Sequence, residues 1–397
     1  MEQLLAKSDL MIASSHYVHQ RKVQGEMNRE WQMNGIYGAR GVGKTTLLLQ
    51  HLKELKHKGK EVLYVRLDDF YFTGNKLYNL ADEFRKNSGE YLYLDEVHKY
   101  TGWSRELKNI YDSMPALKIM FSGSSIIELT MQEADLSRRA LMYSMPGLSF
   151  REYLFLSNII ELPVYNLEQI LSAHNTIAAE ISNNIPVLKH FKHYLKSGFY
   201  PFFLEKNRDY QLTLEQIIRT VLEVDFLHIE QFDSSKSKQI ISLLKIVASS
   251  APFIPNISKI SEKTGLHRQT VLLYLNYLEK AGLVKQLNFP HKSISRLQKP
   301  DKLFLDNPNL FYTLNPGLVN IGSLRETFAV SQLSVKSEIA LHKQADFLID
   351  NKYIFEIGGK NKGNTQIKDL DNAFLFLDDI EVGYKNSIPL WLLGFLY

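Results

Sequence analysis

Hydrophobic positions in the first 160 residues alternate between short continuous runs and longer stretches of helical period. Apolar runs of strand length lie at residues 33–37, 61–67, 90–94, 117–121 and 140–145. Apolar side chains recur at helical spacing over residues 44–57, 76–86 and 103–113. Repeated strand–helix–strand alternation predicts a parallel sheet with helices on both faces. We therefore expect an α/β domain at the start of the chain.

The pattern becomes helical after Ser149, where Ser149-Phe150-Arg151-Glu152-Tyr153 begins a short helix. Further helices are predicted at residues 167–182, 187–196, 212–228 and 237–249. Turns that carry Pro or Gly join them, as in Ser197-Gly198-Phe199-Tyr200-Pro201. This region is expected to form a helical lid or adaptor.

The last third of the chain mixes short helices and strands. Residues 255–287 predict a short helix, a turn, a longer helix and a strand, which resembles a winged helix. After the basic connector 290–302, a helix is predicted at 324–333, with strands at 303–305, 344–349, 353–357 and 390–395. The patterns together predict four domains: an α/β domain at 1–160, a helical lid or adaptor at 161–250, a winged helix at 251–290, and a small α/β module at 300–397.

Composition narrows the class of protein. The 397 residues are 45% hydrophobic and 23% charged, which is typical of globular domains. Cysteine is absent, which excludes disulfides, thiol chemistry and cysteine-ligated zinc or iron–sulfur sites. No apolar stretch has the length of a signal peptide or a membrane span, so we expect a cytoplasmic protein with no membrane partner. The net charge of +4 is too small to imply a polyanionic partner by itself.

The most specific motif is a glycine-rich loop between a strand and a helix. It reads Gly38-Ala39-Arg40-Gly41-Val42-Gly43-Lys44-Thr45 and has the G-x-x-x-x-G-K-T pattern of a P-loop, or Walker A motif. Glycines let backbone N–H groups turn toward phosphate oxygens, and the following helix N-terminus adds positive potential. We expect Lys44 to reach the β- and γ-phosphates of ATP and the Thr45 hydroxyl to bind Mg²⁺.

A second acidic motif follows a later strand. Tyr91-Leu92-Tyr93-Leu94 is apolar and ends in Asp95-Glu96. With 51 positions between Lys44 and Asp95, the chain has room to place Asp95 at the end of a strand beside the P-loop strand. Asp95 would then bind Mg²⁺ directly or through water, and Glu96 would act as the base that polarises the attacking water.

Two further candidates carry weaker signals. The strand 117–121 ends in Ser122-Gly123-Ser124-Ser125, and the hydroxyls of Ser122 and Ser124 would lie near the γ-phosphate if this strand lies between the other two; an exposed polar loop explains them equally. Arg138 and Arg139 are candidates to stabilise transition-state charge, from the same or a neighbouring subunit. A surface ion pair with a nearby acid is the alternative for these arginines.

Together these residues resemble a family of bacterial and archaeal AAA-type ATPases that join a P-loop module, a winged helix and a C-terminal module related to PD-(D/E)xK nucleases. The supporting segments are Gly38–Thr46 with its two threonines, Leu94-Asp95-Glu96-Val97-His98-Lys99 followed by Trp103, Phe121-Ser122-Gly123-Ser124-Ser125, and Leu148-Ser149-Phe150-Arg151-Glu152-Tyr153. The resemblance implies Glu96 as base, Ser122 or Ser124 near the sensor position, and Arg138 or Arg139 near the family's arginine.

The C-terminal module departs from the nuclease pattern. A working centre needs two carboxylates for the metal and a lysine two residues after the second of them. Asp346 and Glu356 occupy strand-like positions and Glu326 the preceding helix, but the lysine position is Gly358. Lys360 lies four residues after Glu356, and its side chain would have to extend back toward the two carboxylates to take the place of that lysine. We therefore expect a degenerate fold retained for binding or packing.

The segment that resembles a winged helix offers a possible DNA interface. Residues 267–270, His-Arg-Gln-Thr, would begin a recognition helix, with lysines at 259, 263, 280 and 285 around it. Winged helices also serve only as packing modules, so DNA contact stays open.

The sequence therefore predicts an ATP-binding and ATP-hydrolysing molecular switch that uses Mg²⁺. Two alternatives remain: a DNA-binding regulatory protein whose nucleotide site only senses, and an ATP-gated nuclease. Double-stranded DNA or a protein is the expected partner, and both a ring of identical subunits and a monomer fit the sequence.

Overall fold

The computed structural model describes the chain except residues 16–20, 22–24, 26, 124–135, 137, 206–208, 229–233, 291–298 and 318. Two compact units form: Met1–Pro146 with Val224–Phe232, and Gly147–Glu223 with Asp233–Tyr397. A short segment from the middle of the chain thus belongs to the first unit. The finer division into four domains stays a prediction. Among the described residues, no helix is long and apolar enough to cross a membrane.

The first unit is built on a five-stranded sheet in which every neighbouring pair is parallel. The strand order is β2-β3-β4-β1-β5. The strands are β1 (Met33–Tyr37), β2 (Val62–Arg66), β3 (Tyr91–Asp95), β4 (Lys118–Gly123) and β5 (Ala140–Ser144). The predicted α/β class and parallel sheet are confirmed, and the sheet is consistent with a P-loop NTPase core. The expectation that Asp95 ends a strand next to the P-loop strand is wrong, because β4 lies between β1 and β3.

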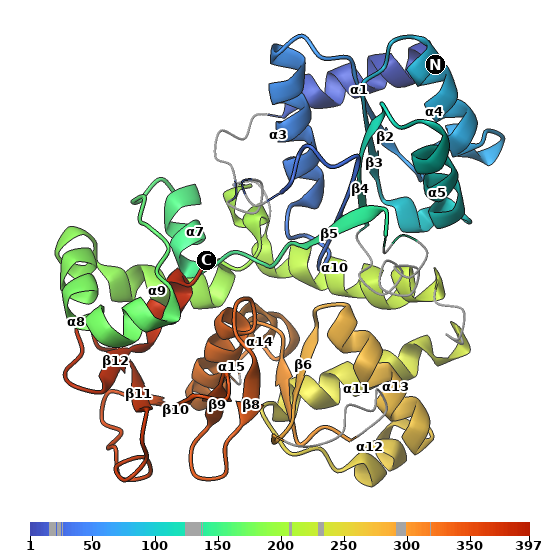
Figure 1. The fold of residues 1–397 in the computed structure, drawn as a ribbon. Helices are drawn as coiled ribbons and strands as arrows, with labels where there is room; N and C mark the ends of the chain where they lie inside the picture. The colour runs from blue at the N-terminus through green and yellow to red at the C-terminus, as the bar shows by residue number, and fades with distance from the viewer. Residues whose placement is uncertain are drawn as a thin grey trace. The chain divides into compact units, whose positions relative to one another are not determined.

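Helices cover both faces of this sheet, with α3 on one side and α4 and α5 on the other (Figure 1). Their bounds are α1 (Glu2–Ser14), α3 (Lys44–His57), α4 (Leu77–Lys86) and α5 (Trp103–Ser113). The edge strand β2 packs against α1, and the Ser8 hydroxyl accepts the Tyr64 N–H at 2.9 Å. This contact satisfies a backbone donor that an exposed sheet edge would leave unpaired.

The sheet holds its shape because both faces are apolar. Leu63, Leu92, Leu94 and Phe121 are fully buried, as continuous apolar strands of a parallel sheet require. Parallel strands place all their carboxyl ends at one edge. Tyr37 is in register with both Gly123 and Ser144, so the loop after β1 opens at this edge.

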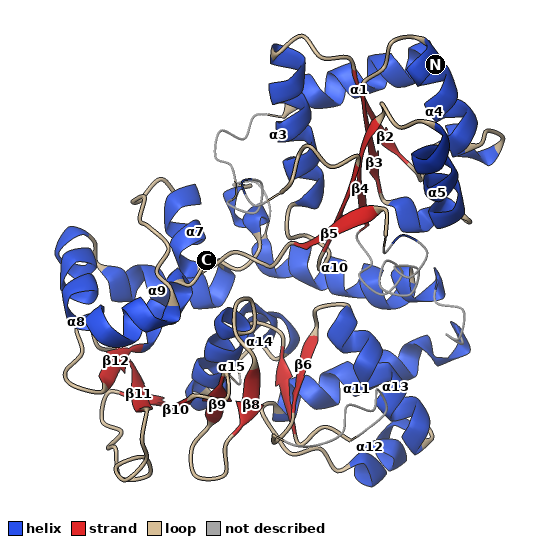
Figure 2. Cartoon of the chain, in the orientation of Figure 1, coloured by secondary structure: helices blue, strands red, loops and turns tan. Residues whose placement is uncertain are grey.

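The second unit is largely helical and also contains two small sheets (Figure 2). Its helices are α7 (Phe150–Leu156), α8 (Leu167–Asn184), α9 (Val187–Ser197), α10 (Tyr210–Glu223), α11 (Ser237–Ser250), α12 (Ile257–Thr264), α13 (Arg268–Lys280), α14 (Asn309–Leu314) and α15 (Ile321–Leu333). Its strands are β6 (Val284–Leu287), β7 (Lys302–Leu305), β8 (Ile339–Leu341), β9 (Phe347–Ile349), β10 (Tyr353–Gly359), β11 (Ala373–Asp378) and β12 (Ser387–Pro389). Short 3-10 helices are η1 (Phe70–Thr73), η2 (Val97–Lys99), η3 (Pro201–Leu204), η4 (Asp225–His228), η5 (Ser234–Lys236) and η6 (Leu390–Phe395).

The C-terminal module is a mixed sheet of order β12-β11-β10-β9-β8. Strands β10 to β12 run parallel, whereas β8 and β9 join antiparallel. Strands β6 and β7 pair antiparallel after α11, α12 and α13. This order of elements is compatible with the expected winged helix, which stays a prediction.

The strand predicted at 344–349 forms only over Phe347–Ile349, so Asp346 lies just before β9 and not within it. Two further element predictions in the second unit are wrong. Residues 390–395 form the 3-10 helix η6 and not a strand, because Leu390–Phe395 is buried at every position and has no alternation of period two. A short continuous apolar run does not distinguish a strand from a buried helix. The helix predicted over 212–228 ends at Glu223, and Asp225–His228 forms a separate turn in the first unit.

Candidate functional site

The loop between β1 and α3 has the backbone that its glycines permit. Gly41 and Gly43 have φ values of 87° and 99°, which side-chain-bearing residues rarely adopt. A Cβ on Gly38 would lie 2.3 Å from the Met145 carbonyl oxygen, so no other residue fits there without a shift. The loop is therefore tightly packed against the end of β5 and leads directly into the N-terminus of α3.

Lys44 folds back over its own loop. Its Nζ donates to the carbonyl oxygens of Gly38 and Ala39 at 2.8 and 2.9 Å. The side chain is 6% exposed, and burial lowers the pKa of Lys44 to about 8 even though Glu96 and Asp95 act to raise it. A phosphate oxygen placed in the loop would be a stronger partner for this ammonium than two neutral carbonyls.

Asp95 is the centre of a cluster of hydroxyl groups. Its Oδ2 accepts from Thr45 Oγ1 at 2.6 Å and from the Tyr64 hydroxyl at 2.8 Å. Its Oδ1 accepts from Ser122 Oγ on β4 and from the Glu96 N–H at 3.1 Å. The carboxylate is 1% exposed, so these donors replace water around a buried charge.

The oxygen atoms of this cluster fit Mg²⁺ chemically. Magnesium takes oxygen ligands and is often held by one carboxylate together with the phosphates of a substrate. Thr45 Oγ1 and Asp95 Oδ2 would supply the protein oxygens. The described part of the chain contains no group of three or more His, Asp or Glu residues that could hold a metal alone.

Glu96 lies just beyond the end of β3 in a left-handed conformation with φ 57°. Its Oε2 lies 3.6 Å from His98 Nε2 and 3.7 Å from Lys99 Nζ. The positive φ turns the chain away from the strand directly after Asp95, so the two neighbouring carboxylates take different directions. Asp95 faces the hydroxyl cluster, whereas the Glu96 carboxylate lies beside His98 and Lys99.

The sequence analysis missed two site residues. Tyr64 gives no signal, because a tyrosine within an apolar strand is typical of a core. Asp225 accepts from Arg40 Nη1 at 2.9 and 3.1 Å, yet the two residues are separated by 185 positions. Only the placement of Val224–Phe232 in the first unit brings them together.

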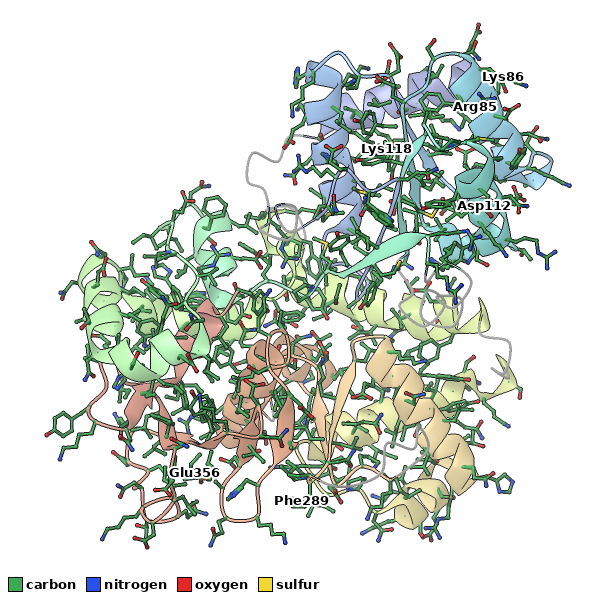
Figure 3. The ribbon with its side chains drawn as sticks, in the orientation of Figure 1. Arg85, Lys86, Asp112, Lys118, Phe289 and Glu356 are labelled. Carbon is green, nitrogen blue, oxygen red and sulfur yellow. The ribbon has the colours of Figure 1, made fainter. Side chains whose placement is uncertain are left out.

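Not every predicted site residue reaches the loop. Ser124 lies outside the described residues. Arg138 and Arg139 come just before β5, at the edge of the sheet opposite the loop, and the nearer of the two, Arg139, lies about 17 Å along the strand from the carboxyl end of β5. Arg139 pairs with Asp112, which Figure 3 labels at the end of α5, at 2.8 and 3.0 Å. Within one chain these arginines do not approach Lys44, and a role in a neighbouring subunit stays a prediction.

The fourth motif, residues 148–153, belongs to the second unit. Ser149 caps α7, and its Oγ donates to the Tyr397 carbonyl oxygen at 2.8 Å. Arg151 Nε donates to the same oxygen at 2.9 Å. This motif therefore holds the last residue of the chain and is not part of the loop site.

The acidic residues of the C-terminal module are engaged with one another. Asp346 Oδ2 accepts the Ile357 N–H at 2.8 Å, and Glu356 Oε2 accepts the Asp346 N–H at 3.1 Å. Lys362 contacts Glu356 Oε1, and its side chain fills the space beside Gly358 (Figure 3 labels Glu356). Lys360, which the sequence analysis considered as the lysine that reaches back, instead lies 3.5 Å from Asp379.

Comparison with known families identifies two segments. Residues 30–154 match the family described as AAA domain, and residues 188–324 match a domain of unknown function, DUF8612. The uncharacterized protein MJ1637 of Methanocaldococcus jannaschii is 28% identical over 368 residues, which cover 84% of this chain and 76% of the relative.

Two solved structures are similar to parts of the chain. AMPPCP-bound DnaA from Aquifex aeolicus matches 65% of this chain and 85% of its own at 17% identity, with a TM-score of 0.26. The Hsp104–ADP complex of S. cerevisiae matches 66% of this chain and 38% of its own at 15% identity, with a TM-score of 0.32. At such TM-scores the AAA assignment rests on the family match over residues 30–154. Residues 30–154, which include the loop after β1 and Asp95, resemble an AAA domain, and this resemblance suggests nucleotide binding and hydrolysis.

Proposed function

We propose that the chain is an ATP-binding and ATP-hydrolysing molecular switch. The single observation that carries the proposal is the contact between Thr45 Oγ1 and Asp95 Oδ2 at 2.6 Å. It joins the end of the P-loop to the end of a strand two positions away in the sheet. P-loop enzymes hold Mg²⁺ between such a hydroxyl and such a carboxylate.

Each residue has a distinct chemical task in this proposal. The backbone N–H groups of the loop and the N-terminus of α3 bind phosphate oxygens, and Lys44 moves from the Gly38 and Ala39 carbonyls onto the β- and γ-phosphates. Bound Mg²⁺ would neutralise charge on the phosphates. Glu96 orients the attacking water and accepts its proton, while Ser122 keeps Asp95 in place from the intervening strand β4.

The test is turnover by Glu96→Gln. Removing the base while keeping the size of the side chain is expected to abolish steady-state hydrolysis and to leave ATP affinity within about twofold. Glu83→Gln is the matched control, because Glu83 is exposed on α4. Turnover by Glu96→Gln at the wild-type rate contradicts the assignment of the base.

A second function, DNA binding, is favoured by the surface around the start of α13. His267, Arg268 and Gln269 are exposed there, and Lys259 and Lys263 are exposed on the preceding helix α12. Cations beside an exposed helix start are typical of phosphate contacts to duplex DNA. We propose that this segment is a winged helix that binds double-stranded DNA.

Arg268→Ala is expected to lower duplex affinity and the dependence of affinity on salt. Arg85→Ala on α4 is the control for loss of one surface arginine. Stimulation of ATP hydrolysis by duplex DNA that fades at higher salt would link the two sites. Equal duplex affinity of wild type and Arg268→Ala would contradict this second function and favour a protein partner.

We further propose that the C-terminal module is a degenerate relative of PD-(D/E)xK nucleases that binds or packs and does not cleave. The contact of Lys362 with Glu356 supports this, because an ammonium group already neutralises the carboxylate that a catalytic metal would need. Incubation of the full chain with duplex DNA, Mg²⁺ and ATP should leave the DNA intact. Cleavage by wild type that Asp346→Ala abolishes would favour the ATP-gated nuclease.

A further inference from the structure

The P-loop contains one long cationic side chain besides Lys44, and it is held by an acid from a distant part of the chain. Arg40 Nη1 donates to Asp225 Oδ1 at 2.9 Å and to Oδ2 at 3.1 Å. Asp225 is 2% exposed. A guanidinium has five N–H donors, and this pair uses only those of Nη1. The arginine therefore has donors with which to bind another anion.

The pair lies within electrostatic reach of the groups that surround the expected γ-phosphate. Arg40 and Asp225 act in opposite directions on the pKa of Lys44, although burial has the largest effect. Burial also raises the pKa of Asp225, against the Arg40 guanidinium, and the Glu96 carboxylate adds to the increase. Arg40 and Asp225 thus belong to a group of interacting charges that also includes Lys44 and Glu96.

Electrostatic attraction favours the transfer of Arg40 from Asp225 to phosphate when a triphosphate enters the loop. The γ-phosphate brings several negative charges next to Arg40, and arginine binds phosphate oxygens through strong charge-assisted hydrogen bonds. The same charges repel the buried Asp225 carboxylate. One anion therefore attracts the arginine and weakens the hold of the aspartate.

We infer that Arg40 is the arginine that stabilises the transition state of hydrolysis from within the same chain, and that Asp225 restrains it until ATP binds. Arg40 takes the role that the sequence suggested for Arg138 or Arg139. Asp225 is a positioning residue, because it acts on phosphate only through Arg40. This inference rests on the proposed ATPase function and deepens it.

The transfer of Arg40 from Asp225 to phosphate would also let nucleotide binding affect residues outside the loop. Val224–Phe232 leaves the second unit at Glu223 and rejoins it at Asp233. Loss of the Arg40 contact removes the charged anchor of η4 (Asp225–His228) on the first unit. The occupancy of the loop by ATP is therefore transmitted to a segment that is covalently continuous with α10.

The test is a double-mutant cycle on ATP turnover with the full chain. Arg40→Ala is expected to lower kcat about a hundredfold with a smaller change in KM. The contact that Arg40 gains with bound ATP is offset by the contact with Asp225 that it gives up, whereas nothing offsets the contact that strengthens in the transition state. Asp225→Asn is expected to lower KM at least about threefold with kcat unchanged, since Arg40 no longer has to leave a partner. In the Arg40→Ala background, Asp225→Asn should have no effect on KM.

Asp82→Asn is the matched control, because Asp82 is a partly exposed partner of Arg85 and Lys86 on α4, away from the loop. The inference is overturned if Asp225→Asn lowers kcat as Arg40→Ala does, since the pair would then be needed intact. It is also overturned if Asp225→Asn leaves KM unchanged.

Hydrogen exchange on the wild-type protein keeps the inference testable if Asp225→Asn does not fold. Adding Mg²⁺ with a non-hydrolysable ATP analogue should speed amide exchange in residues 225–228 relative to ADP. Equal or slower exchange would overturn the inference.

Nucleotide binding separates failure of this inference from failure of the proposed function. A chain that binds no ATP, or hydrolyses it independently of Lys44 and Glu96, refutes the ATPase itself. A chain whose turnover depends on Lys44 and Glu96 but not on Arg40 refutes only the inference.

Discussion

Asp95 in the first unit and Glu356 in the second are both buried carboxylates, and their negative charges are stabilised by different kinds of partner. Asp95 accepts hydrogen bonds from three hydroxyl groups, all of them neutral. Glu356 contacts the ammonium of Lys362 and accepts a backbone N–H. Both side chains are almost fully buried, at 1% and 2% exposure.

The difference shows which acid can accept a metal. Neutral hydroxyls do not cancel the charge of Asp95, and they can turn toward a cation, as the proposed Mg²⁺ site requires. At Glu356 the Lys362 ammonium already supplies positive charge, and Lys362 Nζ also donates to the Ile357 carbonyl at 3.1 Å. A metal would have to displace both contacts. The first cluster suits catalysis and the second suits packing.

The largest expected effect comes from removing the charge of Asp95. Asp95→Asn keeps the shape of the side chain but cannot neutralise Mg²⁺, so kcat/KM for ATP should fall about a thousandfold, or about 4 kcal/mol. Steady-state hydrolysis with coupled phosphate detection measures it. Glu356→Gln should leave turnover within about twofold. Equal losses in the two variants would contradict the distinction between Asp95 as a catalytic acid and Glu356 as a packing residue.

Removing the built-in cation of the second cluster should destabilise the fold. Lys362→Met leaves Glu356 buried without its charged partner, which is expected to lower the free energy of unfolding by about 3 kcal/mol. Denaturant unfolding checks this value. The double variant Lys362→Met with Glu356→Gln should recover most of the loss. A single variant as stable as wild type would mean that the ammonium contributes nothing there.

The charge of Lys44 predicts a pH dependence that sharpens the assignment of the first cluster. Burial lowers the pKa of Lys44 to about 8 in the free protein, so its ammonium loses a proton as pH rises through that value. ATP binding needs the charged form, and affinity should therefore fall about tenfold between pH 7 and pH 9. Fluorescent-nucleotide titration measures the decline. Lys44→Arg stays protonated throughout and should show a much flatter profile.

The smallest effect is expected at the arginines before β5. Arg139→Ala removes an ion pair with Asp112 at the surface, and such solvent-screened pairs contribute little to stability. Turnover at low protein concentration should be unchanged for both Arg138→Ala and Arg139→Ala. If a variant turns over ATP more slowly than wild type only at high protein concentration, a neighbouring subunit supplies the substituted arginine.

Local sequence predicted most of the first unit. The P-loop is contiguous, so its pattern of glycines dictates its backbone. The strands of the first sheet are apolar runs, and their order determines that Ser122 and Asp95 end at one edge. Spacing left open whether the strand at 117–121 lies between the other two, and the sheet order shows that β4 does separate β1 from β3.

The missed features depend on contacts between distant positions. Asp225 joins Arg40 through a segment that leaves the second unit, and nothing near either residue signals it. Arg138 precedes a strand that runs parallel to β1, so the chain direction places it at the wrong edge for the loop. Lys362, and not Lys360, meets Glu356 because the turn after β10 folds back over Gly358.

The most direct test of the central claim is calorimetric titration of the full chain with ATP, with Mg²⁺ present and with Mg²⁺ chelated. The account predicts saturable binding of one ATP per chain that weakens markedly without Mg²⁺, and loss of that Mg²⁺ dependence in Asp95→Asn. No heat of binding, or an affinity that is equal with and without Mg²⁺, would contradict it.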